Sequence, residues 1–188
     1  MKNIKYITQY IGVIFLFTIY KIIGLKKSLK VSAIIFSILG PFFRSKNISK
    51  NNLLKVFPKL TTLEYEKIIK SMWINYGKIF AEYPFIKYYR SLEKLDNKIT
   101  IENQKYLDEI KYDKEPVIFI SGHFNNFELM AMCIENSGID LAAVYRPLNN
   151  IFLNPLMERL RKKYICKKQI KKGISGTKEL LRHFKNGS

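Results

Sequence analysis

A strand–turn–helix–strand pattern in the second half of the chain constrains the fold more than any other feature. Val117–Ile120 is a short apolar run typical of a buried strand, and it leads directly into Ser121-Gly122-His123. From Phe127 onward, apolar residues recur at helical spacing until Gly138, a residue type that commonly ends helices. Leu141–Tyr145 then has the pattern of a second buried strand. Because a helix joins the two predicted strands, we expect them to lie parallel in one sheet.

Polar side chains follow both predicted strands. His123 comes after the first and Arg146 after the second, and the carboxyl edge of an α/β sheet is where ligands usually bind. Glu128 falls in the first turn of the predicted helix. An imidazole can accept a proton from a hydroxyl near neutral pH, and a carboxylate on its other nitrogen fixes the tautomer. The donors of an arginine suit a phosphate or an oxyanion. The alternatives are a structural histidine that caps the helix and a surface arginine in a turn.

The N-terminal region is predicted to contact a membrane. Tyr6–Tyr20 holds no charge, and the apolar run continues to Leu25 with one lysine, close to the roughly 20 residues that a spanning helix needs. Val31–Phe43 is shorter and more typical of an interfacial or re-entrant element. More lysines follow the first run than precede it, so the positive-inside rule places the rest of the chain in the cytoplasm. We expect a membrane anchor over residues 1–45 and an α/β domain over 46–188; a buried core helix is the alternative for the first run.

A long amphipathic helix is predicted between these regions. Thr61 and Glu64 have the spacing of a capping box, and Pro84 is expected to end the helix. Its apolar face carries several aromatic residues at helical spacing, including Trp73 and Phe80. Such a stripe is more often packed core, and the alternative is a groove for an acyl chain. Further helices are predicted at Glu102–Lys114, Pro155–Lys163 and Ser175–Phe184.

The formal net charge of +18 is unevenly distributed along the chain. Met1–Leu63 has eleven basic and no acidic residues, and Ile151–Ser188 has eleven basic residues and two acidic ones. This distribution indicates an anionic partner: nucleic acid, a bilayer surface or an acidic protein. The hydrophobic N-terminus argues against nucleic acid, and the sequence contains no nucleic-acid-binding motif, P-loop, dinucleotide fingerprint, zinc spacing or Gly-x-Ser-x-Gly elbow. The two cysteines lack metal or redox spacing.

Two motifs carry a resemblance to a known family. Ser121-Gly-His-Phe-Asn-Asn-Phe-Glu128, followed by Val144-Tyr-Arg-Pro147, resembles the lipid A biosynthesis lauroyl/myristoyl acyltransferases of Gram-negative bacteria. The stretch from Asn52-Leu53 to Phe57-Pro58 is also similar, so the resemblance covers roughly residue 50 to the end. Related phospholipid acyltransferases usually have Asn-His-x-x-x-x-Asp, whereas this chain has Gly before His and Glu at the end. The implied fold is α/β and glycerolipid acyltransferase-like: an N-terminal membrane helix, then a mixed or mostly parallel sheet flanked by helices.

The resemblance also implies an activity. A fatty acyl group would pass from acyl carrier protein to a hydroxyl of a lipid A precursor, at the cytoplasmic face of the inner membrane. His123 would be the general base, oriented by Glu128, while Arg146 would hold phosphate or stabilise the oxyanion; Tyr145 and Asn126 would be further substrate-binding residues. No metal or cofactor is implied, and nucleic acid is not an expected partner. The basic surface would dock the acidic carrier protein and hold an anionic lipid.

One further expectation concerns the end of the sequence. Family members continue well past the position of Ser188, so the resemblance implies a domain that is incomplete at its C-terminus. A sheet interrupted there would keep an unpaired edge. Two alternatives to the enzyme therefore stay open: a catalytically inactive, membrane-associated fragment of such a protein, and an acyltransferase of the phospholipid type.

Overall fold

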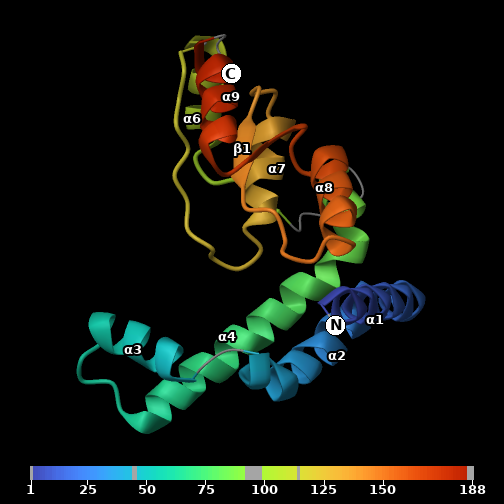
Figure 1. The fold of residues 1–188 in the computed structure, drawn as a ribbon. Coiled ribbons are helices and arrows are strands. Elements are labelled where there is room, and N and C mark those ends of the chain that lie inside the picture. Colours follow the sequence, from blue (N-terminus) through green and yellow to red (C-terminus); the bar gives the residue numbers. More distant parts are fainter. Residues whose placement is uncertain (1, 44–45, 92–98, 114, 186–188) are drawn as a thin grey trace. The chain divides into compact units, whose positions relative to one another are not determined.

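Helices make up most of this protein, and a small parallel sheet completes it (Figure 1). The structure is a computed structural model that describes residues 2–43, 46–91, 99–113 and 115–185. Its contacts group residues 15–85 into one unit and residues 1–14 with 86–188 into another. The elements in chain order are α1 (Lys2–Ile23), α2 (Leu25–Leu39), η1 (Gly40–Phe43), α3 (Lys46–Val56), α4 (Thr62–Glu82), η2 (Tyr83–Phe85), α5 (Ile86–Arg90), α6 (Gln104–Asp113), α7 (Glu128–Asn136), β1 (Ala142–Tyr145), α8 (Leu153–Tyr164), β2 (Lys168–Lys171) and α9 (Ile174–Lys185).

Helix α4 is the helix on which the unit formed by residues 15–85 is packed. It begins with the predicted capping box, in which the Thr61 hydroxyl accepts from the Glu64 amide at 3.3 Å and the Glu64 carboxylate accepts from the Thr61 amide at 2.9 Å. The helix ends before Pro84, as predicted. On its apolar face the Phe80 ring contacts the rings of Phe17 and Phe36, with centroids 5.1 and 5.2 Å apart. This part of the predicted aromatic stripe is therefore packed core.

Helix α2 packs directly against α4. The Ser32 hydroxyl donates to the Gly77 carbonyl at 2.6 Å, and both residues are buried. A Cβ added to Gly77 would lie 2.5 Å from the Ser32 carbonyl oxygen, so the two backbones approach more closely than any other residue would allow. At the start of α2, the Ser28 hydroxyl donates to the carbonyl of Tyr20, which ties α2 to the end of α1. Small residues thus set the spacing of these helices.

The sheet lies in the unit that contains residues 86–188. β1 pairs with β2 in parallel, from Ala142 opposite Lys168 to Tyr145 opposite Lys171, and α8 connects the two strands. The start of α9 packs on β2, because a Cβ on Gly176 would fall 1.7 Å from the Lys171 carbonyl oxygen. The order strand, helix, strand, helix is the one expected for an α/β arrangement. In this part of the chain the sheet has two strands among the described residues.

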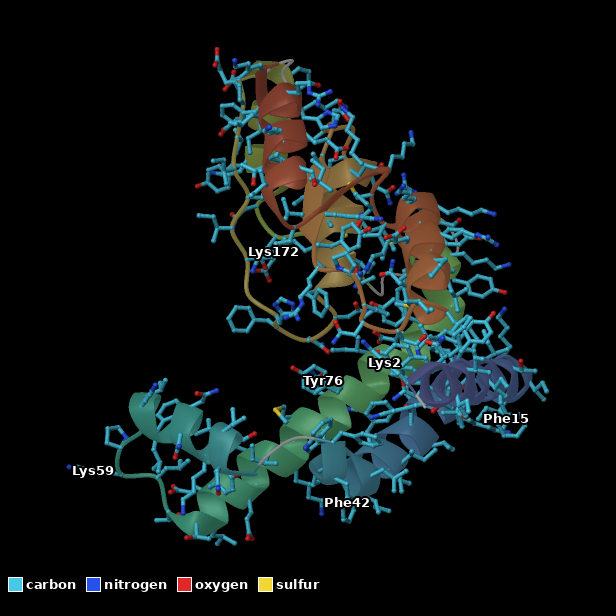
Figure 2. The ribbon with its side chains drawn as sticks, in the orientation of Figure 1. Lys2, Phe15, Phe42, Lys59, Tyr76 and Lys172 are labelled. Carbon is cyan, nitrogen blue, oxygen red and sulfur yellow. The ribbon has the colours of Figure 1, made fainter. Side chains whose placement is uncertain are left out.

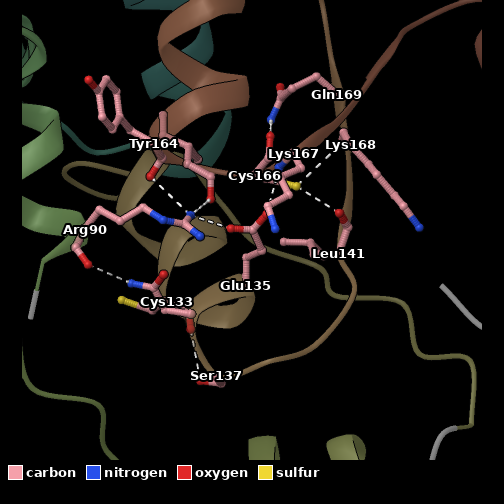
Figure 3. Close-up of polar contacts among 12 residues, drawn as sticks. Arg90, Cys133, Glu135, Ser137, Leu141, Tyr164, Cys166, Lys167, Lys168 and Gln169 are labelled. Atoms are coloured by element: carbon pink, nitrogen blue, oxygen red, sulfur yellow. Dashed lines mark hydrogen bonds and ion pairs between the residues drawn. The ribbon is translucent and has the colours of Figure 1, made fainter.

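Arg90 holds the helices around this sheet together (Figure 3). Its guanidinium forms an ion pair with Glu135 of α7 and donates 3.2 Å to the carbonyl of Ile165, just past the end of α8. The Glu135 carboxylate also accepts from the Lys167 amide at 2.9 Å, immediately before β2. Unsatisfied carbonyls at a helix end need such donors. This cluster therefore joins α5, α7, the end of α8 and the beginning of β2.

The structure corrects the prediction of a buried strand at Val117–Ile120. No strand among the described residues pairs with this segment, and the side chains of Ile118 and Ile120 are 74% and 92% exposed. A strand requires a neighbouring backbone about 4.8 Å away, and a cavity separates this segment from β1. The predicted strand Leu141–Tyr145 does form, as β1, but it is only half-buried and its parallel partner is β2. Of the expected sheet flanked by helices, the described part of the chain contains this pair of strands.

The predicted helices agree more closely with the structure. The helix after His123 forms as α7, and Gly138 beyond its end has a φ of +89°, the left-handed conformation that favours glycine. The predictions at 102–114, 155–163 and 175–184 correspond to α6, α8 and α9. Of the helices in the described ranges, α1 alone is by itself long and apolar enough to cross a membrane. This finding supports membrane association, and the expected domain boundary at residue 45 stays a prediction.

Candidate active site

The predicted site residues gather around one cavity in the unit of residues 86–188. The cavity has a volume of about 1120 Å³ and lies between residues 115–123, α7, β1 and α9. His123, Glu128, Tyr145 and Arg146 all line it. The fifth, Asn126, lies beside the cavity, where its side-chain oxygen accepts from the Glu128 amide at 3.3 Å and satisfies one donor at the start of α7. The structure brings these residues to one place without testing their roles.

His123 lies on the segment that precedes α7 and is exposed to solvent. Its ring packs against Phe127, with centroids 4.2 Å apart and planes tilted by 49°. Within the described residues no hydrogen bond joins the imidazole to Glu128. The imidazole therefore lines the cavity with no hydrogen bond to a described residue to fix its orientation.

Glu128 is buried, and an arginine holds its carboxylate. The oxygen Oε1 accepts from Nε of Arg161 at 2.8 Å and from Nη2 at 2.6 Å. The side chains of Glu128 and Arg161 are 7% and 14% exposed, so this ion pair is largely removed from water. Two donors on one oxygen fix the carboxylate more firmly than a single bond would. Glu128 is thus held on the α7 side of the cavity by a residue of α8.

Arg161 is the residue that the sequence interpretation missed. The sequence predicts a helix at 155–163 and counts its basic residues only within the charge of Ile151–Ser188. A signal for it does exist: Asn154, Glu158 and Arg161 recur at helical spacing, and Glu158 is one of two acidic residues in the last 38 of the chain. Glu158 accepts from Asn154 at 2.9 Å. Of these three residues, Arg161 lines the cavity.

The end of β1 contributes a phenol and a guanidinium. The Tyr145 hydroxyl donates to Glu158, and the Arg161 guanidinium lies over the Tyr145 ring, 5.8 Å from its centroid. Burial raises the pKa of Tyr145 well above its usual value, and the hydrogen bond to Glu158 raises it further. The same hydrogen bond is the main reason why the pKa of Glu158 is lowered. Tyr145 therefore stays a neutral donor at physiological pH.

Arg146 is exposed and lines the cavity. No hydrogen bond or ion pair with the part of the chain that the structure describes occupies its guanidinium. Its donors are therefore available to an anionic ligand. Together the cavity offers an exposed imidazole, a fixed carboxylate and a free guanidinium, a set suited to proton transfer and to oxyanion or phosphate binding. Among the described residues no group of three His, Cys, Asp or Glu side chains is arranged to hold a metal ion.

Comparison with known proteins identifies the family. The family model described as bacterial lipid A biosynthesis acyltransferase matches residues 1–188. Searches of curated proteins and of solved structures found no match. Because the family model covers the whole sequence, the chain belongs to this family, and the predicted family resemblance is confirmed.

Proposed function

We propose that this lipid A acyltransferase-family protein moves a fatty acyl group from acyl carrier protein to a hydroxyl of a lipid A precursor. Membership of the family itself implies an acyl donor and a lipid acceptor in general terms. The particular donor and acceptor are proposed from the resemblance of the two motifs, and the proposed chemistry is supported by the placement of His123, Glu128, Tyr145 and Arg146 around one cavity. A cavity of about 1120 Å³ is large enough for an acyl chain and part of a headgroup.

In the proposed reaction His123 accepts the proton of the acceptor hydroxyl. The hydroxyl oxygen then attacks the thioester carbonyl, the C–S bond breaks, and the departing thiolate takes the proton back from the imidazolium, so that an ester and a free thiol result. Arg146 stabilises the oxyanion or holds a phosphate of the acceptor, and Tyr145 and Asn126 contribute further substrate contacts. A positioned general base contributes about 10²–10⁴-fold to the rate.

Glu128 orients the imidazole in this proposal, and Arg161 acts through Glu128 as a positioning residue. The two hydrogen bonds from Arg161 to Oε1 keep the carboxylate in place while His123 turns from Phe127 toward it. Catalytic hydrogen bonds often tighten only once the substrate is bound. The proposal therefore requires movement of the His123 segment and none of α7.

The proposed location is the cytoplasmic face of the inner membrane. The apolar α1 supplies attachment, and the lysines that follow it favour cytoplasmic retention of the remaining chain. Basic residues of α8, including Arg159, Lys162 and Lys163, would attract the acidic carrier protein and an anionic lipid headgroup. Neither contact requires a cofactor.

The test is acyl transfer from radiolabelled acyl carrier protein to a lipid A precursor by the full chain in detergent. His123→Ala should lower the rate by about 10²-fold or more, whereas His183→Ala, which changes the other histidine, on α9, should leave it unchanged. Equal rates in these two variants would refute the role of His123. Transfer to a lysophospholipid in place of the lipid A precursor would instead assign the phospholipid type of activity.

One observation favours a second candidate, a membrane-associated protein without activity. The segment that carries His123 is unpaired and exposed, and it holds the imidazole against Phe127. Wild-type protein that is folded and bound to membranes, yet transfers no acyl group under conditions where a known family enzyme is active, would establish this candidate.

A further inference from the structure

Helix α2 has two apolar faces, of which α4 covers only one. Ser28 and Ser32 are buried on the covered face, and Phe36 contacts Phe80 of α4. The opposite face carries a stripe at helical spacing that continues into η1. Its members are 39–84% exposed: Val31, Ile34, Ile38, Phe42 and Phe43. In Figure 2 the Phe42 side chain points away from α4. A contiguous exposed apolar surface of this kind marks a binding face.

Charge indicates what covers this face. Lys26, Lys27 and Lys30 are exposed at the start of α2, and residues 25–43 contain no acidic side chain. Basic residues beside an apolar face that ends in aromatic residues are typical of a helix lying on an anionic bilayer. A protein partner would have to present both an apolar groove and a cluster of acids. An anionic bilayer provides both: its charged headgroups can bind the lysines, and its acyl chains lie deeper, where the apolar face can contact them.

The packing of α2 excludes a transmembrane course. The 15 residues of α2 extend about 22 Å, less than the roughly 30 Å of the hydrocarbon core. Leu25–Phe43 reaches the length and apolar character of a span only when it is combined with Asn47–Val56, and the two are bent by 100° to each other. In addition α4, which lies against α2, carries exposed charges on Glu66, Lys67, Lys70 and Lys78. If α2 crossed the bilayer, these charges would enter hydrocarbon at high cost. The short α2 and the charges of the helix packed on it thus favour contact with lipid along the length of α2.

We propose that α2 and η1 form an in-plane lipid-docking element: Leu25–Phe43 lies in the membrane interface, and Phe42 and Phe43 insert among the acyl chains. This contact is additional to attachment through α1, and it does not depend on the proposed acyl transfer. It fixes residues 15–85 against the bilayer surface, whereas α1 alone would only tether them.

The protein contains one tryptophan, which reports on this element. Trp73 of α4 lies directly against η1, because a Cβ added to Gly40 would be 2.2 Å from its indole ring. The experiment measures Trp73 emission of the full chain on phosphatidylglycerol vesicles whose acyl chains are either brominated or unmodified. The apolar faces of interfacial helices lie about 5–10 Å into the headgroup–acyl boundary, so we expect brominated chains to quench the emission about twofold.

Variants separate this docking from attachment by α1. Phe42→Ser combined with Phe43→Ser should restore the emission on brominated vesicles while the protein still sediments with them. Leu63→Ser, which changes an apolar residue of α4 that is 78% exposed, should leave the quenching at its wild-type level. Far-UV circular dichroism checks that each variant is folded.

Equal emission on brominated and unmodified vesicles would overturn the proposal, as would undiminished quenching in the Phe42/Phe43 variant. A stable dimer that forms through this face and leaves Trp73 unaffected by lipid would also overturn it. Because no acyl donor is present, an inactive enzyme gives the same emission, and failure of the proposed function is therefore distinguished from failure of docking.

Discussion

Replacement of Arg161 by methionine tests how the cavity is held together. The change removes both hydrogen bonds to Oε1 of Glu128 and leaves a carboxylate whose side chain is 7% exposed without its main counter-charge. Removal of one partner from a buried ion pair typically costs about 3–5 kcal/mol. Because Arg161 is 14% exposed, some water can reach the site, so we expect about 3 kcal/mol for Arg161→Met.

Urea unfolding followed by far-UV circular dichroism measures this change in the free energy of unfolding. With a slope near 2 kcal/mol per molar urea, a loss of about 3 kcal/mol moves the midpoint down by about 1.5 M. Arg159→Met is the matched control, because it makes the same substitution on an exposed position of the same helix. It should change the free energy of unfolding by about 0.5 kcal/mol or less.

A double variant separates loss of the pair from loss of packing. Arg161→Met with Glu128→Gln removes both charges, so it should recover most of the stability and lie within about 1 kcal/mol of the wild type. The reasoning would be refuted if Arg161→Met were as mild as Arg159→Met, or if the double variant were no more stable than Arg161→Met alone. Either result would mean that the carboxylate is solvated rather than held by Arg161.

Three further predictions concern other contacts. Gly77→Ala should destabilise the protein by about 1–3 kcal/mol, since its Cβ would meet the α2 backbone at 2.5 Å, whereas Gly12→Ala has open space and should be neutral or stabilising in thermal unfolding. The pKa of Tyr145 is higher in the folded than in the unfolded protein, so its contribution to stability is present below about pH 10 and is lost as the pH rises further. The urea midpoint of the wild type should therefore fall at alkaline pH, and Tyr145→Phe should make this fall smaller. Asn150→Asp keeps the oxygen that caps α8 but loses the amide that donates 2.9 Å to the Tyr6 carbonyl, so hydrogen exchange should accelerate at the start of α1 and stay slow in α8.

Much of the fold followed from patterns that act over a few residues. The capping box at Thr61, the end of α7 before Gly138 and the strand β1 each depend on neighbours close in sequence. Val117–Ile120 shows the limit of that approach, because its β-prone residues form a ladder only where a partner strand lies alongside. The strand β2 was missed for the converse reason. Ile170 is its one apolar side chain, and pairing with β1 and the approach of α9 create it.

In the candidate site, too, residues that follow from local patterns could be predicted, whereas a contact between distant residues could not. His123, Glu128, Tyr145 and Arg146 could be placed near one another because each follows directly from a predicted turn or strand end. The ion pair of Glu128 with Arg161 joins residues 33 positions apart, and no local sequence pattern predicts that these two residues meet. Its formation depends on α8 crossing beside α7, which Arg90 helps to set through Glu135 and the end of α8. The roles of the predicted site residues stay predictions.

The two halves of the proposed catalytic pair are held by contacts of very different strength. Glu128 is buried and fixed by two charge-assisted hydrogen bonds, while a ring contact with Phe127 is what holds His123 on an exposed, unpaired segment. Among the described residues β2 is the one strand that pairs with β1, and Val117, Ile118 and Phe119 line the same cavity as β1. If His123 is the base, closure of this segment onto the cavity would bring the imidazole toward Glu128 and beside Arg146. Binding of the acyl chain would then offset the free-energy cost of ordering His123. Variants in Val117–Ile120 should therefore lower the turnover number more than they weaken lipid binding.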